Sequence, residues 1–140
     1  MTENFKIIGS FIKDMSSETP DTPTYIFVRD KISKYRLNID INSKAVKDGI
    51  IEVNTIITFS DQPKNLKKAH FEITYTSIVK VDKKVSDKKE MEKIILCDVP
   101  NKIYPDLERI FLNLLTDSGY PGIKFEKKVN FTELYKQRAN

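Results

Sequence analysis

Two side chains in this 140-residue chain are suited to acid–base or nucleophilic chemistry: His70, the single histidine, and Cys97, the single cysteine. A catalytic histidine acts as a general base beside a Ser, Cys or Asp partner, and the spacing identifies no such partner. Cys97 follows the apolar run Ile94–Leu96, which is typical of a small buried hydrophobic residue. We therefore expect neither residue to be catalytic.

The sequence also lacks the patterns that hold cofactors. With only four glycines, it contains no Gly-rich phosphate loop, no nucleophile elbow and no Cys/His spacing for a metal. A single cysteine excludes a disulfide within the chain. The sequence predicts a protein that is not an enzyme and that binds no cofactor, metal or nucleotide.

The net charge of +4 and the pI near 9.0 suggest a basic α+β module that binds nucleic acid, which we keep as an alternative. However, 20 of the 24 basic residues are Lys, whereas Arg is the better reader of bases and phosphates. The densest basic stretch, Lys80–Lys93, also carries four carboxylates and indicates a solvated loop or helix face. We expect no nucleic-acid partner.

The longest apolar runs span a few residues, and crossing a bilayer takes about 20. The N-terminus shows no basic head followed by an apolar stretch, as a signal peptide would. These features predict a cytoplasmic protein without direct membrane insertion.

Four segments alternate between apolar and polar residues, which predicts strands with one covered face: residues 5–13, 35–41, 51–59 and 71–81. Asp48-Gly49, between the second and third segments, favours a tight hairpin turn. The segment Pro20–Ser33, with its two prolines and clustered apolar residues, fits neither element. We expect it to pack as a lid or to expose an adhesive surface.

The second half changes to helical spacing. Apolar residues recur every three or four positions over residues 103–115, with Pro105 suited to the first turn and Gly119 suited to the end. Asp106 and Glu108 would complement the positive end of the helix dipole.

A shorter helix is predicted over residues 131–138, with Asn130 as its N-cap and Glu133 in the capping-box position. Strands followed by helices imply one α+β domain over residues 1–140. In it, a four-stranded antiparallel sheet carries the C-terminal helices on one face.

Three stretches in order resemble the SecB protein-export family and span nearly the whole chain. They are Ile12–Ser16 followed by Glu18, Pro20 and Pro23; Val99–Pro105; and Gly119–Pro121 followed by Val129–Tyr135. The resemblance implies a homotetramer, built as a dimer of dimers, that binds unfolded preproteins and delivers them to the SecA motor. A SecB-like chaperone dedicated to one client, such as an antitoxin, is the other function it leaves open.

The resemblance also suggests site residues. Asp14, Glu18 and Glu72 match acidic positions at which the family docks SecA. For the client-binding surface we expect large apolar side chains that accept varied sequences. The candidates are Tyr25, Ile26 and Phe27 of the Pro-rich connection, with Tyr104 and Phe111 of the long helix.

Overall fold

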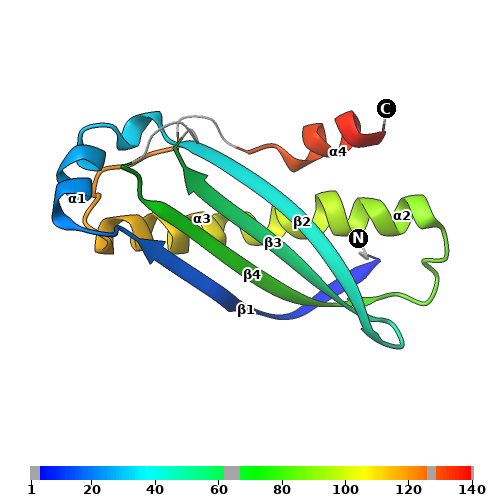
Figure 1. The fold of residues 1–140 in the computed structure, drawn as a ribbon. Coiled ribbons are helices and arrows are strands. Elements are labelled where there is room, and N and C mark those ends of the chain that lie inside the picture. Colours follow the sequence, from blue (N-terminus) through cyan, green and yellow to red (C-terminus); the bar gives the residue numbers. More distant parts are fainter. Residues whose placement is uncertain (1–3, 62–66, 126–128, 140) are drawn as a thin grey trace.

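The computed structural model describes residues 4–61, 67–125 and 129–139 (Figure 1). Its four strands form one antiparallel sheet in the order β1-β4-β3-β2. The strands are β1 (Phe5–Glu18), β2 (Arg36–Lys47), β3 (Ile50–Ser60) and β4 (His70–Val81). The predicted sheet is therefore confirmed, although β1 and β2 continue about five residues beyond the predicted ends.

The turn between β2 and β3 forms where the sequence predicts it. Gly49 has a φ of +72°, a conformation that costs little without a Cβ atom. Two irregularities interrupt β1, between Ile7 and Gly9 and between Ile12 and Asp14. Each adds one residue against β4 and so changes which side chains face the helices. The simple alternation in the sequence did not reveal these bulges.

The Pro-rich connection is helical, contrary to our expectation of an irregular segment. Helix α1 (Thr22–Arg29) and a 3-10 turn, η1 (Ile32–Lys34), occupy it. Asp21 caps α1 by accepting a hydrogen bond from the Thr24 backbone N–H at 2.8 Å. Pro23 lies in the first turn, where its missing N–H is not needed.

The long helix begins earlier than predicted. Helix α2 (Lys88–Lys93), a π-helical segment η2 (Ile94–Asp98) and α3 (Val99–Asp117) follow one another without a break. Pro105 therefore lies inside α3 rather than in its first turn, and Asp106 and Glu108 lie too far from the helix start to complement its dipole. Pro105 is exposed, so water solvates the carbonyl that loses its partner. The π-helical segment shifts the apolar period, so the helical spacing in the sequence is regular only from residue 103 onward.

Helix α3 ends as predicted, with Gly119 just beyond it at a φ of +102°. The Gly119 N–H donates to the Thr116 carbonyl at 3.1 Å, and the Tyr120 N–H donates to the Leu115 carbonyl at 2.9 Å. This pair of bonds is a Schellman cap, which a left-handed glycine permits. Helix α4 (Phe131–Ala139) is also confirmed, because Asn130 Oδ1 accepts from the Glu133 N–H at 3.1 Å.

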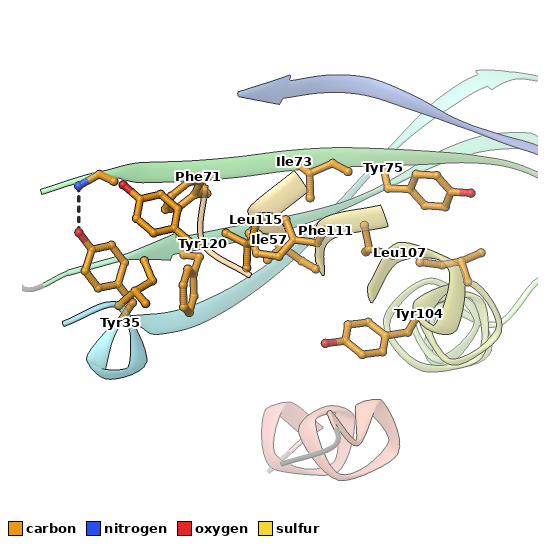
Figure 2. Close-up of a cluster of buried hydrophobic side chains, with 14 of the residues drawn as sticks. Tyr35, Ile57, Phe71, Ile73, Tyr75, Tyr104, Leu107, Phe111, Leu115 and Tyr120 are labelled. Carbon is orange, nitrogen blue, oxygen red and sulfur yellow. Dashed lines mark hydrogen bonds between the residues drawn. The ribbon is translucent and has the colours of Figure 1, made fainter. Parts of the chain in front are cut away.

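The core lies between the sheet and the helix layer (Figure 2). Residues from β3, β4 and α3 fill it without solvent exposure, including Ile57, Phe71, Ile73, Leu107 and Phe111. The buried backbone N–H of Ala69 donates to the Tyr35 hydroxyl at 2.9 Å, at the end of the sheet near α1. None of the helices in the described ranges is both long and apolar enough to span a membrane.

Candidate functional site

His70 and Cys97 lie in different parts of the fold, on β4 and in η2. His70 pairs with Ser60 and Glu18 on neighbouring strands, on the sheet face that points away from the helices. Cys97 is 3% exposed, with its Sγ 3.4 Å from Thr132 Oγ1. The prediction that Cys97 is a small buried residue is confirmed.

The three predicted docking carboxylates come together on the outer face of the sheet, opposite the helices. In the register of β1 and β4, Ser16 pairs with Glu72. Asp14 and Glu18 lie two residues to either side of Ser16 and share its face, so each is a diagonal neighbour of Glu72. Diagonal neighbours across antiparallel strands lie roughly 7–8 Å apart. The strand order, which the sequence did not disclose, creates this acidic patch of Asp14, Glu18 and Glu72.

Lys13, the basic residue next to Asp14 in the chain, does not neutralise the acidic patch. The Lys13 ammonium is bound to Glu52 Oε2 at 3.1 Å, which directs it toward β3 and away from Asp14. Hydrogen bonds from Asn54 and Lys13 hold the pKa of Glu52 below its usual range. On the outer face, Glu52 is thus paired with Lys13, whereas Asp14, Glu18 and Glu72 form the separate acidic patch.

The predicted client residues of α1 have two different environments. Tyr25 is held in place by two contacts. Its hydroxyl donates to the Gly119 carbonyl at 2.7 Å, and the centroid of its ring lies 5.3 Å from that of Tyr120. Ile26 is 53% exposed, and Phe27 is half-buried beneath the Lys31 ammonium. Ile26 therefore has the most exposed apolar surface of this group, and Phe27, unlike Tyr25, is not held by a side-chain hydrogen bond to α3's end.

Tyr104 and Phe111 lie within the core of the chain. Phe111 is 0% exposed and Tyr104 is 8% exposed, so neither offers a wall to a client in this conformation. The Tyr104 hydroxyl is buried without a hydrogen-bond partner in the described part of the chain. Burial, reinforced by the nearby Glu108 carboxylate, raises the pKa of Tyr104 to about 12. Helical spacing alone could not tell these core positions from a groove lining.

An apolar groove lies elsewhere, between strand β2 and helix α4. Its volume is about 270 Å³, and its lining comes from β2, η2 and α4: Ile39, Ile41, Leu96, Phe131, Leu134, Tyr135 and Gln137. Because β2 is an edge strand, its helix-side residues in the groove are only half-buried. The helix-side residues of the interior strands are covered. Leu134, on the other wall, is 44% exposed. Sequence reasoning found the apolar face of β2 and the helix over residues 131–138, but not that this helix lies across that face.

The opposite edge of the sheet is also apolar. Strand β1 exposes four large hydrophobic side chains along its length: Ile8, Phe11, Ile12 and Met15. A long exposed edge strand presents unpaired backbone groups as well as apolar surface, which favours association with another chain.

Comparisons with known proteins agree with this architecture. The family model described as preprotein translocase subunit SecB matches residues 1–140. A protein of Pelagibacter ubique (strain HTCC1062), provisionally named protein-export protein SecB, is 92% identical over 140 residues and the full length of both chains. The protein-export protein SecB of Methylocella silvestris is 23% identical over 130 residues, covering 93% of this chain and 79% of that protein.

Among solved structures, a Mycobacterium tuberculosis SecB-like chaperone in complex with a ChAD peptide from the HigA1 antitoxin has a similar fold. The TM-score is 0.68 at 10% identity, covering 91% of this chain and 92% of the other. Together, the family match over the whole chain and the near-identical relative show that this protein belongs to the SecB family of non-enzymatic, cytoplasmic protein-export chaperones.

Proposed function

We propose that this protein captures unfolded preproteins on two apolar surfaces and passes them to SecA through the acidic patch. The observation that carries the proposal is the groove between β2 and α4, which is lined mainly by apolar side chains and open at a sheet edge. The exposed part of α1, formed by Ile26 and Phe27, supplies the second surface.

The chemistry of both surfaces suits a holding chaperone. Such a protein needs many weak apolar contacts that accept varied sequences and cover exposed hydrophobic chain before it aggregates. Of the other candidates from the sequence, Tyr104 and Phe111 support these surfaces from within the fold, and Tyr25 anchors α1 through its bond to the Gly119 carbonyl. An unfolded segment can also pair its backbone with the free edge of β2, in addition to placing side chains in the groove.

The test is suppression of aggregation of an unfolded client. Two variants remove apolar surface at the proposed sites: Ile26→Ser with Phe27→Ser, and Leu134→Ser. Val46→Ser is the matched control, because Val46 is 58% exposed on the distant β2–β3 hairpin. We expect the first two to suppress aggregation less than the parent and the control to match it. Equal suppression by all four proteins would contradict the assignment.

SecA docking is supported by a local cluster of negative charge on a chain whose net charge is positive. Three carboxylates within one patch of a chain of net charge +4 produce a local field that favours a specific basic partner over diffuse attraction. In this proposal the basic tail of SecA binds across the ends of β1 and β4, where Asp14, Glu18 and Glu72 lie.

Peptide binding tests the docking site. The variant D14N/E18Q/E72Q should bind the SecA tail peptide more weakly than the parent, with the difference largest at low salt. The control D106N/E92Q/E133Q removes the same charge from the helix layer and should retain binding. If the first variant binds as tightly as the parent, SecA docks elsewhere or not at all.

We also propose a homotetramer, assembled as a dimer of dimers, in which the exposed side chains of β1 are covered. Light scattering at micromolar concentration should return a mass of four chains, or of two on dilution. The variant Ile12→Lys introduces a charge into the apolar edge and should lower the mass. A parent protein that is only monomeric would contradict the proposal.

A further inference from the structure

A row of lysines crosses the outer face of the sheet at the end opposite the acidic patch. Lys6 pairs directly with Lys80, Lys80 pairs with Ile50, and Ile50 pairs with Lys47. Residues paired in this way point to the same face, so Lys6, Lys80, Ile50 and Lys47 form one row across the sheet, with lysines on β1, β4 and β2 and an isoleucine on β3. We call these three lysines the lysine row.

No carboxylate of the described residues forms an ion pair with the lysine row. Like charges directly opposite one another on a sheet are destabilising, and among the described residues Lys6, Lys47 and Lys80 form no ion pair. Asp48 and Asp82 lie in the adjoining turns. Asp82 Oδ1 accepts from the Lys84 N–H at 2.9 Å, which holds it to its own turn.

A shallow hollow of about 320 Å³ adjoins the lysine row. Its lining is Phe5, Lys6, Lys80, Val81, Asp82 and Lys83. Lys83 adds a further ammonium group, and all three lysines of the hollow are exposed. The hollow therefore offers three ammonium groups against one carboxylate, Asp82, to an anionic group from outside.

The β2–β3 hairpin lies at this same end of the sheet, beside the start of β1 (Figure 1). Val46, the extra residue between Ala45 and Lys47 in the pairing of β2 with β3, is 58% exposed, the highest value among the exposed large hydrophobic side chains of the described residues. An aliphatic side chain next to lysines is suited to the boundary between lipid headgroups and acyl chains.

We propose that the lysine row, Lys83 and Val46 dock this chaperone onto an anionic membrane surface. Juxtaposed lysines bind anionic headgroups as point charges, each worth about 1 kcal/mol near the surface. A nucleic acid fits less well, because the row contains no Arg and its neighbouring aromatic, Phe5, is only 8% exposed and so gives no stacking platform.

Such docking is peripheral and leaves the protein on the cytoplasmic side. It would hold the chaperone at the membrane by one end of the sheet while the acidic patch at the other end stays free. The inference does not depend on SecA docking, because it rests on different residues and is tested without SecA or client.

Co-sedimentation with vesicles is the test. The parent protein should bind phosphatidylcholine vesicles that contain phosphatidylglycerol, should not bind phosphatidylcholine alone, and should be released by salt. The variant K6Q/K80Q/K83Q should bind roughly a hundredfold more weakly. The control K34Q/K67Q/K124Q loses the same charge at the opposite end of the molecule and should bind nearly as the parent does. Val46→Ser should weaken binding by about tenfold without any change in charge.

Four results would overturn the proposal. The first is a parent that does not sediment with the anionic vesicles. The second is equal weakening in both lysine variants, which would indicate diffuse attraction by net charge. The third is competition by free glycerol phosphate at the same headgroup concentration, which would indicate a site for a small anion. The fourth is a single-stranded oligonucleotide that binds the parent but not K6Q/K80Q/K83Q and displaces the vesicles.

Discussion

The two ends of the helix layer are attached to the sheet in different ways. At the α1 end, three side-chain hydrogen bonds of 2.7–2.9 Å tie separate segments together: Ser17 with Ser118, Thr19 with Tyr120, and Tyr25 with the Gly119 carbonyl. At the other end, the groove of about 270 Å³ remains beneath α4.

This difference indicates where the molecule opens most readily. Local stability follows the density of buried contacts, and segments with few of them open without global unfolding. Among the side chains of residues 131–137, only Phe131 is large and fully buried against the core, and the Tyr135 hydroxyl reaches the Lys89 carbonyl only at 3.3 Å. We infer that α4 opens more readily than the α1 end of the helix layer.

The sharpest test compares two phenylalanines that are both 0% exposed, Phe111 and Phe131. Phe111→Ala should lower the free energy of unfolding of the whole domain by about 3–5 kcal/mol, since it leaves a cavity between sheet and helix. Phe131→Ala removes the same side chain, but it should mainly lower the free energy needed to open α4. Denaturant unfolding with hydrogen exchange distinguishes them. Equal loss of protection in the sheet amides of both variants would refute the difference between the two ends.

A pair of glycines tests the α1 end. Gly119 and Gly122 both have positive φ, but a Cβ at Gly119 would lie 2.8 Å from the Tyr25 ring, whereas nothing lies within 4 Å of one at Gly122. Gly122→Ala should cost about 1–2 kcal/mol from backbone strain alone. Gly119→Ala should cost roughly 1–3 kcal/mol more because the ring must move. Similar midpoints in thermal unfolding would show that Tyr25 does not anchor α1.

The cap of α4 provides a smaller effect. Asn130→Ala removes the acceptor for the Glu133 N–H and should cost about 1 kcal/mol. Because α4 is weakly attached, we expect this cost in the local opening of α4, seen as faster amide exchange in residues 131–139. The melting temperature of the sheet should change little. A lower melting temperature of the sheet would mean that α4 unfolds together with the core.

The smallest effect concerns Tyr104, which lies between the two ends. Its folded pKa of about 12 exceeds the ordinary tyrosine value of 10.0, so the unfolded chain loses this proton first as the pH rises. The stabilising effect of the neutral Tyr104 hydroxyl is present below about pH 10 and is lost as pH rises toward 12. Tyr104→Phe should therefore reduce the alkaline loss of stability between these values. At pH 7 it should be nearly neutral, since the hydroxyl has no described partner. An unchanged pH profile would contradict the assignment.

Much of the fold could be predicted because its signals are local. The alternation in residues 51–59 and 71–81 identified β3 and β4 and their helix-side faces, and Asp48-Gly49 identified the turn between β2 and β3. Gly119 and Asn130 marked the end of α3 and the start of α4 for reasons of backbone conformation and capping. The start of the long helix was predicted incorrectly, because α2 buries no side chain and the π-helical turn breaks the period.

The candidate sites were less accessible to sequence reasoning, since each depends on strands or helices that are distant in the chain. Leu134 and Ile39 meet across the groove only because α4 lies over β2, and sequence reasoning did not detect the groove. The motif resemblance singled out Asp14 and Glu72, but their proximity required β4 to pair with β1.

The sequence by itself therefore determined the strands, the turn and helix-capping residues, and the family resemblance, because each of these depends on residues close together in the chain or on short motifs in order. Only the tertiary structure decided the strand order β1-β4-β3-β2. This order assembles the acidic patch at one end of the outer face and the lysine row at the opposite end. The physical reason is that cross-strand register depends on how whole faces are buried against the helices, which no local pattern records.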